Sequence, residues 1–124
     1  MIAELFNKVV DEQLTTCKNV LCSKANEYAT EDRLHNFKQA AHIQKTSPTK
    51  ALAGMMAKHT VSVYDMIESG REYTGAMWDE KITDSINYLL LLKALVYDQQ
   101  LAIPCDFGEE LYCCDNQKFT LASQ

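Results

Sequence analysis

The chain has 124 residues, 47% of them hydrophobic, and its 12 Lys and Arg against 17 Asp and Glu give a formal net charge of −5 at pH 7. This length and composition indicate a single globular domain and exclude an intrinsically disordered chain. The acidic balance disfavours binding of nucleic acid, because a phosphate backbone usually meets a basic surface.

The N-terminal segment is amphipathic and acidic, unlike the basic and then apolar start of a secretory signal. No apolar run approaches the ~20 residues needed to cross a bilayer, and the longest, residues 88–97, is interrupted by Lys93. We therefore expect a soluble, cytoplasmic protein without membrane contact. The 5 cysteines are odd in number and lack the spacing of a zinc site, which favours reduced structural thiols.

The first half of the chain predicts two helices. Apolar residues recur at helical spacing from Ile2 to about Tyr28, which indicates one long amphipathic helix. Thr30 or Asp32 is placed to cap a second helix that ends at about Lys45. Its expected inward residues are Leu34, Phe37, Ala40, Ala41 and Ile43.

Ser47 and Pro48 mark the clearest helix start in the chain, since serine is a good N-cap and proline suits the first helical position. This third helix is predicted to run to about Ser69 and to end at Gly70. Its expected inward residues are Leu52, Met55, Met56, Val63, Met66 and Ile67.

A fourth helix is predicted from near Ala76, and four helices with short connections indicate an all-α, four-helix antiparallel bundle over residues 1–103. Residues 104–124 form a C-terminal extension in which two short extended runs flank an Asp-Asn turn. A small hairpin alone is marginal in water, so we expect the extension to pack on the bundle or on a neighbouring subunit. The leucine-rich stretch 89–95 leaves apolar surface to cover, which predicts a homo-oligomer.

The fourth helix carries the strongest chemical signal. Glu80, Asp84 and Asn87 share one helical line, which continues into Leu91 and the most hydrophobic part of the chain. Carboxylates are costly to bury unless they are paired, protonated or bound to a metal. The line therefore indicates a functional site for which other helices supply partners.

The third helix offers His59, which lies on the apolar stripe between Met56 and Val63. It is interpreted either as a core histidine with a satisfied hydrogen bond or as a group that faces the carboxylates of the fourth helix. Lys58 lies on another face and is within reach of an anionic ligand at the rim of the bundle.

The start of the second helix is densely polar, with Asp32, His35 and Asn36 close to Arg33. Ordinary capping explains this composition, but a helix N-terminus also attracts anions, and Arg33 and Lys38 would add to that attraction. Among the aromatic residues, Tyr28 and Tyr88 are candidates to stack on a nucleotide base, although core packing is the commoner role of such residues.

Three segments, KANEYATEDRLHNFKQAA, ALAGMMAKHTVSVYDM and WDEKITDSINYLLLLKAL, resemble a family of small phage and prophage proteins. The shared pattern covers roughly residues 24 to 97 and is carried by Lys24, Tyr28, Asp32, Leu34, Asn36, Phe37, Lys58, His59, Trp78, Glu80, Lys81, Asp84, Asn87 and Tyr88. That family is distantly similar to the all-α, MazG-like nucleoside triphosphate pyrophosphohydrolases, which are oligomeric and Mg²⁺-dependent. The resemblance implies nucleotide handling, and a host cytoplasm as the location if the protein is phage-encoded.

The metal site of the MazG-like enzymes pairs an E-x-x-E motif on one helix with an E-x-x-D motif on the next, and the resemblance implies that Asp84 corresponds to the last aspartate. The position three before Asp84 is Lys81, and Glu80 stands one residue further back. Either the site is rebuilt from Glu27, Glu31 or Asp32 together with Glu80 and Asp84, or it is lost. In the second case Lys81 forms an internal ion pair that takes the place of the metal.

Three functions follow from these residues. The first is hydrolysis of a nucleoside triphosphate to monophosphate and pyrophosphate, in which Glu80 and Asp84, with Glu27 and Asp32, hold Mg²⁺ or Mn²⁺. Lys58 and His59 would then contact phosphate.

The second is binding of a nucleotide or another small phosphorylated ligand without turnover. Its phosphate contacts would be Lys24, Arg33, Lys58 and Lys81, and a tyrosine would stack on the base. The third is an interaction protein that inhibits a host partner, with Glu80, Lys81 and Asp84 in an ion-paired subunit interface.

Overall fold

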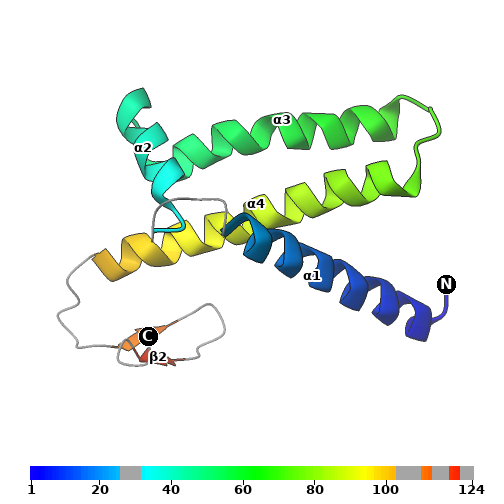
Figure 1. Ribbon diagram of the computed structural model, residues 1–124, viewed down its shortest axis with the longest axis horizontal. Helices are drawn as coiled ribbons and strands as arrows, with labels where there is room; N and C mark the ends of the chain where they lie inside the picture. Colours follow the sequence, from blue (N-terminus) through cyan, green and yellow to red (C-terminus); the bar gives the residue numbers. More distant parts are fainter. Residues whose placement is uncertain (26–31, 103–109, 113–117, 121–124) are drawn as a thin grey trace.

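The computed structural model describes residues 1–25, 32–102, 110–112 and 118–120 (Figure 1). Within them lie the helices α1 (Ala3–Ala25), α2 (His35–Gln44), α3 (Pro48–Glu68) and α4 (Gly75–Ala102). The short strands β1 (Glu110–Tyr112) and β2 (Lys118–Thr120) pair antiparallel, with Leu111 opposite Phe119, inside the stretch for which two extended runs are predicted. The all-α class with four helices is confirmed, and the predicted Asp-Asn turn lies outside the described residues.

The helix boundaries follow the local capping signals. The Oγ atom of Ser47 accepts a hydrogen bond from the backbone N–H of Lys50 at 3.3 Å, and Pro48 occupies the first helical position, so the predicted start of α3 is confirmed. Gly70 follows α3 with a φ of 67°, in the left-handed region that glycine adopts at little cost. The start of α4 has a cap that the sequence analysis did not single out, because the Oγ1 atom of Thr74 accepts from the N–H of Met77 at 3.2 Å.

Helices α3 and α4 form the body of the molecule. They lie side by side in opposite directions, α2 packs on α3 near one end, and α1 meets α4 near its middle (Figure 1). The core cluster contains Leu34, Phe37, Leu52 and Leu95, and the last two are 0% exposed. Met55, Met56, Tyr88, Leu91 and Leu92 pack against it.

The inward face of α2 and α3 is narrower than predicted. Leu34, Phe37 and Leu52 are buried as expected, but Ile43 is 78% exposed and Ile67 is 63% exposed. Met66, the residue before Ile67, is only 6% exposed, so packing reaches the end of α3 and Ile67 lies outside the covered side of the helix. Periodicity therefore located the apolar stripe but not how much of its width the neighbouring helices cover.

Helix α1 packs less closely against the rest of the molecule than α2, α3 and α4 pack against one another. Only Cys17 is buried along its described side chains, and its polar link to α4 is a 2.8 Å hydrogen bond from the Nε2 atom of Gln13 to the Oγ1 atom of Thr83. The core cluster contains no α1 residue. The described chain is thus an α2–α3–α4 core with α1 laid against α4, and closure into an antiparallel four-helix bundle stays a prediction.

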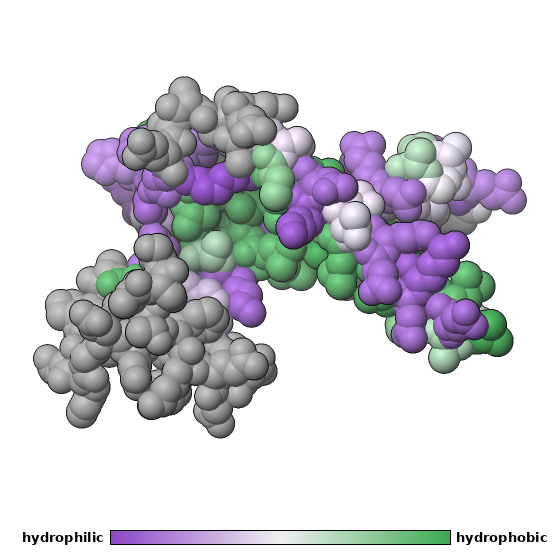
Figure 2. All heavy atoms as spheres, turned by 60° about the horizontal axis from the view of Figure 1, so that its bottom comes forward, coloured by the Kyte–Doolittle hydropathy of each residue, from purple (hydrophilic) through white to green (hydrophobic). Residues whose placement is uncertain are grey.

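The hydrophobic residues of the molecule are not all enclosed, and Figure 2 shows a band of them across the middle of the face that it draws. In the part of the chain that the structure describes, no helix combines the length and the hydrophobicity that crossing a membrane requires.

Candidate functional site

A cavity of about 150 Å³ lies where the four helices approach one another. Its apolar wall comes from α1, α2, α3 and α4 and consists of Val20, Leu21, Phe37, Met55 and Leu91. Its polar wall consists of Arg33, Asn36, Asp84, Asn87 and Tyr88, all of which the sequence analysis names as candidate site residues. The structure therefore brings together candidates that are separated by about half of the chain.

The geometry of α4 explains why three of these residues meet. Asp84, Asn87 and Tyr88 stand at i, i+3 and i+4, so they occupy one face of the helix, and Leu91 continues the same face into the core. The prediction that Asp84 and Asn87 share a line running toward the apolar end of α4 is confirmed. Arg33 and Asn36 reach the cavity from the turn before α2 and from its first turn.

Asn87 is the most unusual polar group in the cavity wall. Its side chain is 6% exposed, and neither the Nδ2 nor the Oδ1 atom has a hydrogen-bond partner among the described residues. Each unpaired buried polar group costs roughly 1–3 kcal/mol, and native proteins keep few of them. A buried amide that lines a cavity and has no partner in the protein has the properties of a ligand contact.

His59 connects α3 to the same wall. Its Nδ1 atom lies 3.7 Å from the Oδ2 atom of Asp84, and its ring centroid lies 4.9 Å from that of Tyr88. The histidine and aspartate side chains are both partly buried. The interpretation in which His59 faces the carboxylates of α4 is therefore confirmed. The nitrogen–oxygen distance of 3.7 Å is too long for a direct hydrogen bond.

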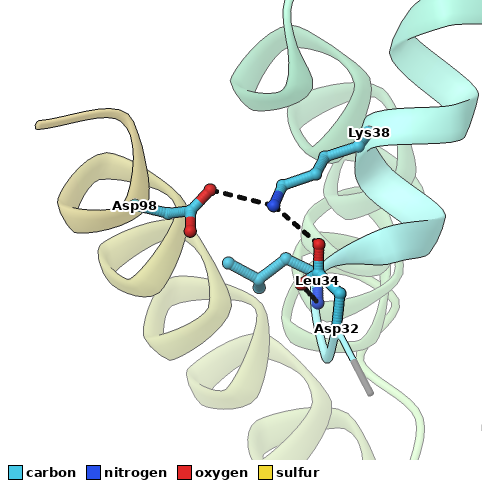
Figure 3. Close-up of polar contacts among 4 residues, drawn as sticks. All are labelled: Asp32, Leu34, Lys38 and Asp98. Carbon is cyan, nitrogen blue, oxygen red and sulfur yellow. Dashed lines mark hydrogen bonds and ion pairs between the residues drawn. The ribbon is translucent and has the colours of Figure 1, made fainter. Parts of the chain in front are cut away.

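Asp32 belongs to a different contact group, which Figure 3 shows. Its Oδ1 atom accepts from the backbone N–H of Leu34 at 2.9 Å, and its Oδ2 atom accepts from the Nζ atom of Lys38 at 2.7 Å. Lys38 also lies 3.0 Å from the Oδ2 atom of Asp98, near the C-terminal end of α4 (Figure 3). Asp32 thus closes the turn before α2, and Lys38 joins that turn to α4.

These contacts move two pKa values. The hydrogen bond from Lys38, followed by the bond from the Leu34 N–H, lowers the pKa of Asp32. The hydrogen bonds to Asp32 and then to Asp98 raise the pKa of Lys38. Both shifts favour the charged forms of Asp32 and Lys38. The group of Asp32, Lys38 and Asp98 is called the clasp below. The sequence did not predict Asp98 or its contact with Lys38, because no local spacing relates residues on two separate helices.

The acidic residues at the start of α4 border a second, more open depression of about 390 Å³, which lies between α1 and α4. Its wall contains Asp79, Glu80, Thr83 and Asp84 together with Thr16 and Val20 of α1. Among the residues that the structure describes, no group of three His, Cys, Asp or Glu side chains is arranged to hold a metal ion. Of the predicted metal ligands, Glu80 and Asp84 lie together here, Asp32 lies in the clasp, and Glu27 is outside the described residues.

Lys81 makes no ion pair with Glu80 or Asp84 in the described part of the chain. The predicted replacement of a metal by an internal ion pair is therefore wrong for this conformation. Lys58 is exposed on α3, and His35 lies in the first turn of α2 without lining the cavity. The side chain of Lys24, and the whole of Tyr28 and Glu31, lie outside the described residues.

Comparisons of the chain with protein-family models, with curated proteins and with solved structures found no match in any of the three. The resemblance to phage proteins and to MazG-like enzymes accordingly stays a prediction, and the function is argued below from the cavity itself.

Proposed function

We propose that this protein binds a nucleotide, with the base inside the cavity and the phosphates at its mouth, and that binding needs no metal. The observation that carries the proposal is the unpaired amide of Asn87, buried in the wall of the cavity. An asparagine side chain presents a donor and an acceptor side by side, and this pair matches the adjacent acceptor and donor on the edge of a base.

The size of the cavity supports insertion of one ring system. Sites that enclose a whole drug-sized ligand usually measure 300–1,000 Å³, whereas this cavity measures about 150 Å³. A space of that size accommodates a planar ring but not a ring with its sugar and phosphates. The sugar and phosphates would therefore extend outward, where Arg33 stands in the polar wall with a positive charge.

The charges in the cavity wall also favour a nucleotide bound with its base inward and its phosphates outward. Asp84 lines the cavity next to Asn87, and a carboxylate repels phosphate but accepts hydrogen bonds from ring or exocyclic N–H groups. Asp84 and Asn87 together favour a base that offers at least two N–H donors and one acceptor. Adenine, guanine and cytosine meet this requirement better than uracil and thymine. The resemblance to nucleotide-handling phage proteins supports the same ligand class.

A second candidate is the metal-dependent hydrolysis of a nucleoside triphosphate, as in the MazG-like enzymes. The observation that favours it is the row of Asp79, Glu80 and Asp84 along the open depression beside the cavity. Glu80 and Asp84 would hold Mg²⁺ or Mn²⁺, with Glu27 and Asp32 as further candidates, and the metal would polarise a phosphoryl oxygen. This function needs a third ligand to join the pair, because the described residues hold no group of three.

One calorimetric titration with product analysis separates these functions. Nucleoside mono- and triphosphates and cyclic nucleotides carrying each base are titrated first in EDTA and then with Mg²⁺. We expect binding in EDTA without products, weaker for uracil and thymine than for the other bases. Monophosphate and pyrophosphate formed only with Mg²⁺ would instead establish the hydrolase. The absence of any binding in both conditions would contradict both functions and favour the third possibility, an interaction protein.

The variant Asn87→Leu tests the same proposal at the residue that carries it, with Leu89→Ala as the matched control. Leu89 is on α4 but is exposed and does not line the cavity. We expect Asn87→Leu to lower the affinity at least tenfold, and Leu89→Ala to leave it unchanged. Equal affinity for the two variants would contradict the role of Asn87.

A further inference from the structure

The N-terminal half of α1 presents an apolar face that nothing in the described chain covers. Six large hydrophobic side chains are exposed along it: Ile2, Leu5, Phe6, Val9, Val10 and Leu14. The charged residues of this half, Glu4, Lys8, Asp11 and Glu12, stand on the opposite side of the helix by its 100° rotation per residue. The two faces are thus cleanly separated, which is the pattern of a helix that packs along its whole length.

The cause of the exposure is the path of α1. In its C-terminal half the same face is used, because Cys17 is buried and Gln13 bonds to Thr83 of α4. Toward the N-terminus α1 diverges from α4, and its end lies well away from the other helices (Figure 1). Figure 2 shows hydrophobic residues exposed at that end of the molecule. The uncovered face is therefore a direct continuation of the face that already packs within the chain.

From this geometry we infer that the N-terminal halves of two α1 helices pack antiparallel against each other and form a twofold-symmetric homodimer. The pattern of the face is what such a pair requires. Counting backwards and forwards from the point between Asn7 and Lys8, Phe6 falls opposite Val9 of the second copy. Leu5 likewise falls opposite Val10, and Met1 opposite Leu14. Ile2 falls opposite Gln13, at the point where Gln13 bonds to Thr83 of α4. The two apolar pairs nearest the axis therefore bring a larger side chain against a smaller one, and the contact ends where α4 begins to cover the face.

The available area is of the right order for a stable dimer. At the exposed fractions of these six side chains, each copy contributes on the order of 600 Å² of apolar surface, against roughly 800 Å² per partner in a standard interface. Met1 and the polar residues that border the apolar face supply the rest of the interface area. A single apolar patch of this size is at the upper limit of what monomers expose.

The charge distribution favours a second copy over a membrane. The polar face of this half holds three acids and one lysine, whereas helices that lie on anionic lipid are usually rich in Lys and Arg. Between two copies, by contrast, the contacting faces carry no charge, so the net charge of −5 on each chain does not bring like charges into the interface. Pairing of the α1 helices would also give α1 the second neighbour that it lacks in the single chain.

Sedimentation velocity on the purified full chain tests the inference, over a range of micromolar concentrations. We expect twice the chain mass of 14.1 kDa for the wild type, and 14.1 kDa for the variant Phe6→Glu. Lys8→Glu is the matched control, because Lys8 is on the opposite face and its contact with Glu12 is a 3.9 Å pair between exposed side chains. It is expected to stay dimeric. Phe6 is exposed in the single chain, so its replacement leaves the helical circular dichroism signal in place.

A size exchange tests the antiparallel register. Phe6→Val alone weakens the dimer at least tenfold, and the double variant Phe6→Val with Val9→Phe recovers it, because the exchanged residues meet each other across the twofold axis. A parallel pair would place Phe6 against its own copy, and the double variant would not recover. A wild-type mass of 14.1 kDa, a dimer that persists in Phe6→Glu, or failure of the double variant to recover would each overturn the proposal.

Discussion

The α2–α3–α4 core and helix α1 are both rich in hydrophobic residues but use them differently. In the core, Leu52 and Leu95 are fully enclosed and Leu34 and Phe37 nearly so. In α1, Phe6 and Leu14 are more than half exposed and only Cys17 is buried. Because stability follows buried apolar area rather than apolar content, the free energy of unfolding resides in the core, and α1 adds little until another surface covers it.

The candidate site lies at the boundary between these two regions. Val20 and Leu21 of α1 form one side of the cavity, and Phe37, Met55 and Leu91 of the core form the other. A ligand bound there contacts both regions, so it stabilises the attachment of α1 by an amount that grows with the logarithm of its concentration relative to its Kd. We therefore expect changes in the core to lower stability, and changes at the boundary to alter binding as well as stability.

The largest effect is expected in the core. Replacing Leu95 by alanine removes buried methyl groups and leaves a cavity, and should lower the free energy of unfolding by roughly 2–5 kcal/mol. Leu14→Ala on α1 is the matched change at a side chain that is 56% exposed in the single chain. Measured in the monomeric Phe6→Glu background, it should cost less than about 0.5 kcal/mol. Urea unfolding followed by circular dichroism measures both. Similar losses in the two variants would contradict the contrast between core and α1.

The next effect is expected at the boundary, and it has the opposite sign. Asn87→Leu replaces an unpaired buried amide by an apolar group of similar volume, so the free energy of unfolding should rise by roughly 1–3 kcal/mol while nucleotide binding is lost. The same urea unfolding experiment measures the gain. Asn19→Leu, at an exposed position of α1, controls for the change in composition and should be near neutral. Destabilisation by Asn87→Leu would show that the amide has a partner in the folded protein.

The smallest effect is expected at the clasp. Lys38→Met removes both ion pairs of Lys38, but these side chains are more than a third exposed, so the free energy of unfolding should fall by no more than about 1 kcal/mol. Lys8→Met, which removes the longer and more exposed pair with Glu12, should have a smaller effect. Added salt should reduce the difference between the two variants, and a difference that grows with salt would contradict the electrostatic origin.

The pKa shifts at the clasp set the pH dependence of its contribution. The pKa of Asp32 is lowered, so its contribution is complete above the ordinary value of 3.8 and is lost as the pH falls through the lowered pKa. The pKa of Lys38 is raised, so its contribution is complete below 10.5 and is lost as the pH rises through the raised pKa. Between these limits, the stability difference between wild type and Lys38→Met should be constant. A change of that difference near pH 7 would contradict the attribution of the clasp's contribution to charged Asp32 and charged Lys38.

The sequence predicted those parts of the fold and site that depend on local spacing. The start of α3 follows from Ser47 and Pro48, and the meeting of Asp84, Asn87 and Tyr88 follows from the helical period. For His59 the helical period left two interpretations open, and the structure supports the one in which it lies near a carboxylate of α4.

The remaining features depend on how separate helices are placed, which the helical period does not contain. The contact of Lys38 with Asp98 joins residues on α2 and α4. The exposure of Ile43 and Ile67 depends on how much of each helix surface the neighbouring helices cover. That the amide of Asn87 lacks a partner is visible only once the surrounding side chains are in position.

The NMR signals of the Asn87 side chain test most directly whether its buried amide contacts a ligand. The side-chain amide resonances of Asn87 are assigned by their disappearance from the ¹⁵N–¹H spectrum of Asn87→Leu, and then followed while guanosine or adenosine monophosphate is added in EDTA. If Asn87 contacts the ligand, we expect saturable shifts both of these two proton resonances and of the backbone amide resonances around Asp84 and Tyr88. Resonances of Asn87 that stay in place while the nucleotide shifts others, or a nucleotide that shifts none, would contradict it.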